Sequence, residues 1–381
     1  MDHATAVAQA KQIADHIVAP HAARHDRAGD FPVEGMAALG KAGLLGLVVP
    51  KDRGGSGLGP STFAEVTAAL SLADASIGMI YTMHVCATLC LVSARTGAKT
   101  EPVLRAIAAG QHLTTLAFSE KGSRSHFWAP VSRAQSIPAG VELSARKSWV
   151  TSAGHADSYV ISSLSPDAKG PTDSTLYLVA KDTVGLKVAA PWDGMGLRAN
   201  ASAPMTLEGC FVPDDARLTD DGAGFKAMLE VVLPFFNLGS AAVALGLCRA
   251  AVGATVTHLK TAVFEHLGAS LGESLPNLRA TLARMQIETD GLAARMQDVI
   301  AHLEHPSDQT MLRVLESKAA AGEAAIQVTS QAMRACGGAA FSRQTGLDRF
   351  FRDAHAGSVM APTVDVLHDF IGKALLGIPL F

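Results

Sequence analysis

The spacing of apolar residues changes twice along this chain, and this change constrains the fold more than any other feature. Helical spacing occurs at residues 4–25, 60–72 and 75–94. Short β-type runs separated by Gly, Pro, Ser and Asp clusters follow at 113–118, 159–163, 176–180, 185–188 and 205–212. Long helical patterns return at 225–263, 276–303 and 308–334, where Gly337-Gly338 is expected to end the last helix. The pattern predicts a helical domain at 1–112, a middle β-domain at 113–218 and a second helical domain at 219–381.

The composition indicates a large buried core and excludes several classes of partner. The 381 residues are 48% hydrophobic with a net charge of −3, and the mean hydropathy is +0.23. Near-neutral charge gives no reason to expect nucleic acid or an anionic membrane. We expect no membrane-spanning run, because no apolar stretch is expected to reach spanning length without an interrupting charge; the stretch 241–256, for example, contains Arg249. The start of the chain lacks the basic and apolar regions of a signal peptide, and the odd, scattered set of five cysteines predicts reduced thiols in a cytoplasmic protein.

Three local patterns favour ordinary structural roles. The five cysteines are scattered, with Cys86 and Cys90 one helical turn apart, and are expected to be reduced thiols. His21 and His25 have a zinc-compatible spacing, but no further ligand pattern accompanies them, so we predict no metal site. The glycine-rich stretch at 54–59 lacks the Lys-Ser/Thr ending of a phosphate loop and is expected to be a tight turn.

Several short motifs occur in a fixed order along the chain. They are Gly43-Leu44-Leu45-Gly46 with 49–58, then 118–125, then Lys147-Ser148-Trp149-Val150-Thr151-Ser152 with Ala156-Asp157, then Gly196-Leu197-Arg198 and Phe211-Val212-Pro213, and finally Gly337-Gly338, 348–353 and 359–363. This ordered set covers almost the whole chain and resembles the acyl-CoA dehydrogenase superfamily. The resemblance implies an N-terminal helical domain, a middle β-barrel-like domain and a C-terminal four-helix bundle. The fold class expected is therefore mainly α with a central β-domain.

The resemblance implies FAD as the cofactor, in preference to FMN. It places the flavin ring against Phe118, Ser119, Trp149 and Thr151, with Thr151 donating to the N5 edge. An apolar face beside an in-plane hydroxyl suits a flavin ring. Ser125 and Ser119 stand where the family has hydroxyls that could bind flavin oxygens or the pyrophosphate, and a surface-loop role is a nearly equal alternative for both serines.

Other expected cofactor contacts lie near the C-terminus. By resemblance, Gly337 and Gly338 let a neighbouring subunit approach the ADP half of FAD, since a residue without Cβ allows close backbone contact. Thr363 and Asp365 are also expected to bind the cofactor. The family's usual Arg that reaches across to the pyrophosphate is missing, and Lys260 is a candidate replacement. These features imply a homo-oligomer, a tetramer or a dimer of dimers.

The decisive departure from the family is Ala361. The family has a catalytic Glu at this position, which removes the substrate's α-proton as hydride leaves for the flavin. Alanine cannot act as a base, and neither can Phe236 or Asn237 at the family's alternative base position. The backbone N–H of Ala361 can still polarise a substrate carbonyl.

Two histidines are candidates for a compensating catalytic role. His84 lies on a helix that in this fold borders the substrate cavity, and His368 lies in the final helix. Imidazoles of this kind serve near the flavin in oxygen-using members of the superfamily. A satisfied, half-buried histidine is at least as good an interpretation for each one.

Three functions follow from the resemblance. The first is an oxidase or monooxygenase acting on an acyl thioester, such as a CoA ester, or a similar carbonyl compound. The second is a dehydrogenase with a relocated base that passes electrons to an electron-transfer flavoprotein; a flavin reductase is a further candidate partner. The third is a binding or structural protein that kept the fold. We favour the first.

Overall fold

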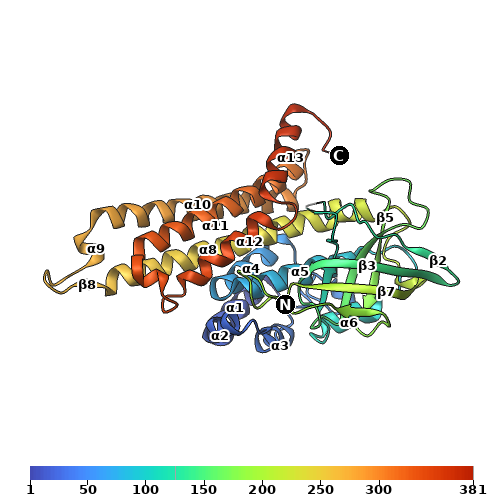
Figure 1. Ribbon diagram of the computed structural model, residues 1–381, viewed down its shortest axis with the longest axis horizontal. Coiled ribbons are helices and arrows are strands. Elements are labelled where there is room, and N and C mark those ends of the chain that lie inside the picture. Colours follow the sequence, from blue (N-terminus) through green and yellow to red (C-terminus); the bar gives the residue numbers. More distant parts are fainter. Residues whose placement is uncertain (125, 381) are drawn as a thin grey trace.

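The computed structural model describes residues 1–124 and 126–380. Figure 1 shows an elongated helical bundle at one end, a β-domain at the other, and the N-terminal helices against the middle of the molecule. Ser125, one of the expected cofactor contacts, lies outside the described residues.

Six α-helices make the N-terminal lobe. They are α1 (His3–Ile13), α2 (Ala19–Ala28), α3 (Val33–Lys41), α4 (Pro60–Ala73), α5 (Ala75–Val92) and α6 (Glu101–Ala108). A π-helical turn, Ala14–Val18, joins α1 to α2, and a 3₁₀ turn, Lys51–Arg53, precedes α4. The Asp74 side chain caps α5 by accepting from the Ser76 N–H.

The middle domain packs two small sheets. Its strands are β1 (Thr114–Ala117), β2 (Gln135–Ile137), β3 (Gly140–Val150), β4 (Ser158–Leu164), β5 (Ser174–Ala180), β6 (Leu186–Val188) and β7 (Ala203–Pro213). One sheet has the order β1-β4-β5, with β1 and β4 parallel; the other has the order β2-β3-β7-β6 and is antiparallel. The long β3–β7 pair contains two register shifts, the second between Lys147 and Val150.

Long helices form the C-terminal bundle. They are α8 (Leu233–Thr261), α10 (Pro276–Glu304), α11 (Thr310–Phe341), α12 (Leu347–Val359) and α13 (Val364–Leu376). Shorter elements complete this part: the 3₁₀ turn Asp214–Ala216, α7 (Gly224–Ala227), the π-helical turn Met228–Val232, β8 (Val263–Phe264), β9 (Ala269–Ser270) and α9 (Leu271–Ser274). Helix α13 projects from the side of the bundle (Figure 1).

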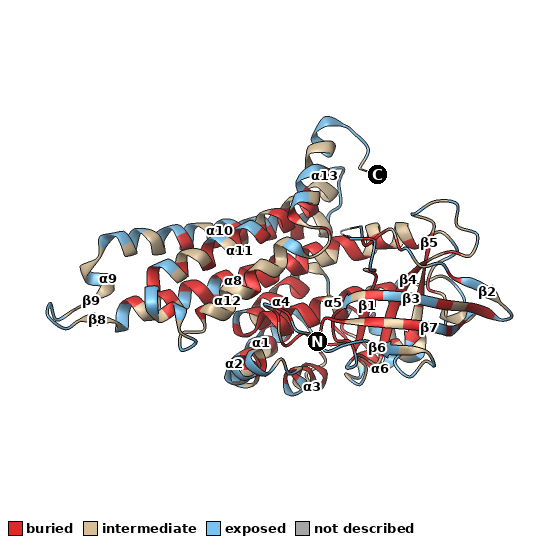
Figure 2. Cartoon of the chain, viewed as in Figure 1, coloured by how far each residue is buried: buried red, intermediate tan, exposed pale blue. Residues whose placement is uncertain are grey.

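Helix α8 is the centre of the helical core. It packs against α4 and α5 on one side and against α10 and α11 on the other, and Figure 2 shows it buried along most of its length while the outer face of α10 is exposed. Gly246 permits the α4 contact, because a Cβ there would lie 2.5 Å from the Ser71 Cβ. A larger residue would force the two helices apart.

Two helical segments are long and apolar enough to cross a membrane by length and composition, Ala75–Val92 and Gly224–Thr261. In each, 83% of the apolar window is buried inside the protein, as in core helices. The expectation that no such run exists was therefore wrong for α5, which carries no Asp, Glu, Lys or Arg.

The predicted changes of character fall between elements. The last N-terminal helix ends at Ala108 and β1 begins at Thr114, while β7 ends at Pro213 and α7 begins at Gly224. The sequence pattern missed β3, because Lys147 occupies an inward position and interrupts the apolar alternation. The long helix expected to end at Gly337-Gly338 does break there, because Gly337 has non-helical backbone angles, and a second short helical stretch continues to Phe341.

Candidate active site

A cavity of about 710 Å³ lies where the three parts of the chain meet. Its apolar wall comes from α5, β1 and the C-terminal helices, and includes Met79, Met83, Leu116, Val232, Phe236 and Met360. Its polar wall comes from the middle domain and includes Ser119, Ser148, Thr151, Asn200 and Ser202. This volume and this division between apolar and polar walls suit a small organic cofactor together with part of a substrate.

Trp149 presents its indole to this cavity. The residue sits at the irregularity in the β3–β7 pairing, with φ of +57°, and its exposed fraction is 65%. Bulges next to functional sites re-aim side chains in this way. Trp192 packs edge-on against it, with ring centroids 5.7 Å apart, so the free indole face is available to a flat ligand.

Thr151, two residues after Trp149, lines the same cavity. Its Oγ1 is 3.1 Å from the Ser202 Oγ, and the Asn200 side chain accepts from the Ser202 N–H. Phe118 and Ser119 line the same cavity. The structure therefore brings together four of the residues predicted to contact a flavin.

A buried ion pair forms part of the polar wall, since its carboxylate partner, Glu120, lines the cavity. Lys147 Nζ donates to Glu120 Oε1 at 2.5 Å and to the Ser162 carbonyl, while the other carboxylate oxygen accepts from the N–H groups of Val131 and Ser132. Burial by itself raises the pKa of Glu120, but the Lys147 charge and these hydrogen bonds together hold it below its usual value.

Ala361 lies on the cavity wall, in the turn between α12 and α13. Among the described residues, no acceptor pairs with its backbone N–H. This N–H is therefore available to donate a hydrogen bond to a substrate carbonyl oxygen and so to polarise it.

Lys318 of α11 lies under this turn, and no sequence motif pointed to it. Its Nζ donates to the carbonyl oxygens of Pro362, Met360 and Gly357 at 2.6, 3.0 and 3.4 Å. The carbonyls of Gly357 and Met360 belong to the C-terminal end of α12, and the C-terminus of a helix favours a nearby cation. Burial lowers the pKa of Lys318 to about 7. The sequence feature that could have indicated Lys318 is a single lysine among small residues on an otherwise apolar face of α11.

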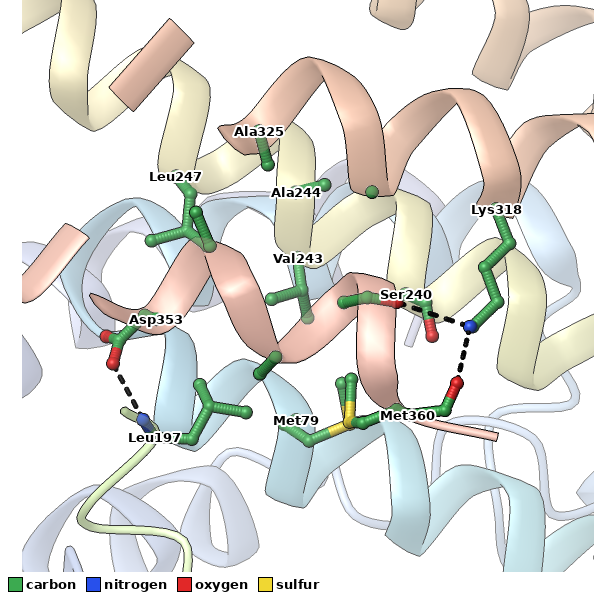
Figure 3. A pocket seen from close by; sticks show the side chains of 14 residues that line it. Met79, Leu197, Ser240, Val243, Ala244, Leu247, Lys318, Ala325, Asp353 and Met360 are labelled. Carbon is green, nitrogen blue, oxygen red and sulfur yellow. Dashed lines mark hydrogen bonds between the residues drawn. The ribbon is translucent and has the colours of Figure 1, made fainter. Parts of the chain in front are cut away.

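A second buried titratable group, Asp353 of α12, lies at the far end of a small void of about 20 Å³ from Lys318 (Figure 3). Its Oδ1 accepts from the Leu197 N–H at 2.7 Å. Burial, reinforced by the nearby Asp74 carboxylate, raises the pKa of Asp353 to about 7. The void has room for about one water molecule.

The catalytic role predicted for His84 does not agree with its surroundings. Its ring is fully buried: Nε2 lies 3.0 Å from the Leu45 carbonyl, and Nδ1 accepts from the Thr114 N–H. Burial lowers its pKa to about 4. His84 does not line the cavity, so it joins α5 to β1 as a structural residue.

His368 is also absent from the cavity lining. It lies on α13, where Nε2 is 3.6 Å from a Glu323 carboxylate oxygen, and its side chain is 49% exposed. Thr363 caps α13 by accepting from the Val366 N–H, and Asp365 lies in the first turn of that helix. Neither lines the cavity within this chain.

Gly337 and Gly338 lie away from the cavity, near the end of α11. Gly337 has φ of +55° and ψ of −134°, a conformation that needs glycine. A Cβ added at either glycine would meet nothing within 4 Å. The surface of this kink is therefore open. No group of three or more His, Cys, Asp or Glu side chains in the described parts of the chain could hold a metal ion.

Three family models match consecutive parts of the chain. They are the acyl-CoA dehydrogenase N-terminal domain at 1–111, the middle domain at 115–210 and the C-terminal domain at 222–376. The chain therefore belongs to the acyl-CoA dehydrogenase superfamily.

One curated relative and two solved structures illustrate the similarity. The probable acyl-CoA dehydrogenase YngJ of Bacillus subtilis is 27% identical over 368 residues, or 96% of each chain. Butyryl-CoA dehydrogenase from Megasphaera elsdenii matches with a TM-score of 0.92 and 22% identity, over 99% of this chain and 100% of that one. PigA with FAD and proline matches with a TM-score of 0.90 and 20% identity, over 99% and 100%.

Proposed function

We propose that this protein is an FAD-dependent oxidoreductase that acts on an acyl thioester, such as a CoA ester, or on a similar carbonyl compound, with oxygen as oxidant or oxygen donor. The observation that carries this proposal is that the described lining of the cavity contains no free carboxylate that could act as a base. Glu120 is the only acidic side chain among the described lining residues, and its carboxylate is occupied by Lys147 and backbone donors.

The cavity wall supports a flavin. The exposed indole of Trp149 offers a flat apolar face, and Thr151 lines the same cavity. When bound, FAD supplies an electron acceptor for the substrate or, once reduced, an electron donor to oxygen. PigA, which shares the fold, has been solved with FAD and with proline, a ligand that is not a thioester.

The lining offers no ready base for an α-proton. A carboxylate that already accepts from an ammonium and two N–H groups, and whose pKa is held low, is a poor proton acceptor. Neither His84 nor His368 lines the cavity. The coupled removal of a proton and a hydride, which ordinary acyl-CoA dehydrogenation needs, therefore lacks a proton acceptor among the described residues that line the cavity.

The remaining side chains can orient a substrate and keep water out. The backbone N–H of Ala361 is free to donate to a carbonyl oxygen, and Met83, Val232 and Phe236 give the adjoining wall an apolar surface. An apolar wall limits water beside a reduced cofactor, which favours productive use of oxygen over side reactions.

We further propose a homotetramer with FAD at subunit interfaces. Three features support an assembly in which another subunit covers this part of the surface: the open glycine kink at Gly337, the projecting helix α13, and the exposed side chains of Phe341 and Leu376.

The electron partner is a flavin reductase if substrate does not reduce the flavin, and an electron-transfer flavoprotein if the protein is a dehydrogenase.

The test is turnover of a panel of CoA thioesters with FAD-loaded protein under labelled dioxygen. We expect label in the product or release of peroxide, and slow turnover of butyryl-CoA. The proposal fails if anaerobic butyryl-CoA bleaches the flavin rapidly and only an artificial acceptor or an electron-transfer flavoprotein sustains turnover. Protein that never binds FAD would favour the binding-protein alternative.

A further inference from the structure

The polar wall of the cavity carries two cations with no partner among the described residues. Its charged lining residues are Glu120, Lys121 and Arg124. The Glu120 charge is already balanced by Lys147. Within residues 1–124 and 126–380, no carboxylate or carbonyl oxygen pairs with the side-chain nitrogens of Lys121 or Arg124, and both side chains are exposed. This wall is therefore positively charged.

A tight turn holds both cations at the cavity. The Ser123 N–H donates to the Glu120 carbonyl at 3.1 Å, and the Lys121 N–H donates to the Arg146 carbonyl at 3.2 Å. The buried ion pair of Glu120 anchors the start of the turn. The side chains therefore extend from a fixed base and not from a free loop.

Arg124 occupies an unfavourable backbone conformation. Its φ is +48°, a left-handed value that glycine adopts freely and that residues with a Cβ rarely adopt. Within the described chain, the Arg124 side chain makes no hydrogen bond or ion pair that would offset this strain. A ligand contact would explain why a cationic side chain stands at a position that favours glycine.

We propose that Lys121 and Arg124 form a subsite for the diphosphate group of a nucleotide-type ligand. The guanidinium can donate two parallel hydrogen bonds to phosphate oxygens, and the ammonium adds a mobile positive charge. The inference rests on the proposed function, because FAD and a CoA thioester both carry a diphosphate. The subsite serves whichever of the two lies along this wall.

The experiment compares the full-length wild type with Lys121→Gln, Arg124→Gly and the double variant. Lys169→Gln is the matched control, since Lys169 is an exposed lysine of the same domain that does not line the cavity. Dissociation constants are measured for FAD against riboflavin, and for coenzyme A against pantetheine. Each pair differs in the diphosphate and the nucleotide beyond it.

We expect each single variant to weaken one diphosphate ligand roughly tenfold, which is the usual effect of losing one hydrogen bond to a charged group. Riboflavin, pantetheine and the Lys169→Gln control should show no change. A loss confined to FAD identifies the cofactor as the ligand, and a loss confined to coenzyme A identifies the substrate.

Arg124→Gly also separates binding from structure. Because glycine relieves the left-handed strain, this variant should raise the thermal midpoint of the ligand-free protein while it weakens the diphosphate ligand. Unchanged affinity for both FAD and coenzyme A in the double variant overturns the subsite. Equal loss for riboflavin or pantetheine overturns it as well. A wild type that binds neither FAD nor coenzyme A overturns the proposed function together with the subsite.

Discussion

Two lysines are almost fully buried behind the same cavity, and they are stabilised in different ways. Lys147 in β3 faces the Glu120 carboxylate, whereas Lys318 in α11 faces only carbonyl oxygens. Burial lowers the pKa of both amines, but only at Lys147 does a carboxylate oppose that effect. The polar wall of the cavity thus contains a full ion pair, whereas the Ala361 turn is held by a buried amine that faces only carbonyl dipoles.

The difference teaches how firmly each wall is fixed. Removing one partner of a buried ion pair leaves an unpaired charge in the interior. Removing a buried amine from carbonyls leaves unpaired acceptors, and this costs less because no formal charge remains. We therefore expect the polar wall to be the more rigid of the two and the Ala361 turn to be the more sensitive to pH.

The largest expected effect is that of Lys147→Met. Glu120 would then be buried without its counter-charge, which should lower the free energy of unfolding by about 3–5 kcal/mol. Denaturant unfolding at pH 7 measures this loss. In the double variant Glu120→Gln/Lys147→Met the loss should be smaller than in the single variant; an equal or larger loss would show that the charge is not the cause.

Lys318→Met should have a smaller effect, about 2 kcal/mol at pH 7, since it leaves three carbonyl oxygens without a donor. The exposed Lys187→Met on β6 serves as the control and should change little. If Lys318→Met destabilises the protein as strongly as Lys147→Met, then losing an ion-pair partner does not cost more than losing an amine that faces only carbonyl groups.

The two lysines should also differ in pH dependence. The Lys318 pKa is about 7 in the folded protein and about 10.4 in an unfolded chain. Between these values the unfolded state binds more protons, so wild-type stability should rise with pH relative to Lys318→Met, by at most about 1.4 kcal/mol per pH unit. Parallel stability curves for the two proteins between pH 7 and 9 would contradict this.

For Asp353 the expected change of stability with pH has the opposite sign to that for Lys318. Its pKa is raised to about 7 when folded, against about 3.9 in an unfolded chain. The folded state therefore binds more protons between these values, and wild-type stability should fall by about 1 kcal/mol between pH 5 and 6 relative to Asp353→Asn. Asparagine can still accept from the Leu197 N–H. If the difference in unfolding free energy between the two proteins does not change between pH 5 and 6, the pKa of Asp353 is not raised to about 7.

The smallest effect on stability is expected for Trp149→Ala. The side chain is 65% exposed, so the ligand-free protein should change by less than about 0.5 kcal/mol. FAD affinity should nevertheless fall, because an aromatic contact contributes about 0.5–1.5 kcal/mol. Fluorescence titration measures the affinity; unchanged affinity would remove Trp149 from the cofactor wall.

The sequence allowed the order of domains and the middle-domain wall to be predicted, because both depend on local patterns. Helical spacing identified the long helices, and the segment around Trp149 and Thr151 kept its motif. The partners of His84 could not be seen in this way, since Leu45 and Thr114 are 39 and 30 residues away. Lys318 could not be identified for the same reason: its acceptors, at the end of α12 and in the turn that follows, are 39 to 44 residues away in sequence.

The burial of α8 also has a consequence for synthesis of the chain. Helices α4 and α5 leave the ribosome before α8, whereas α10 and α11 follow it. The side of this apolar helix that packs against α10 and α11 is therefore fully covered only after translation has passed residue 341. We expect the nascent chain to need chaperone protection during this interval, and low growth temperature to improve the yield of folded protein.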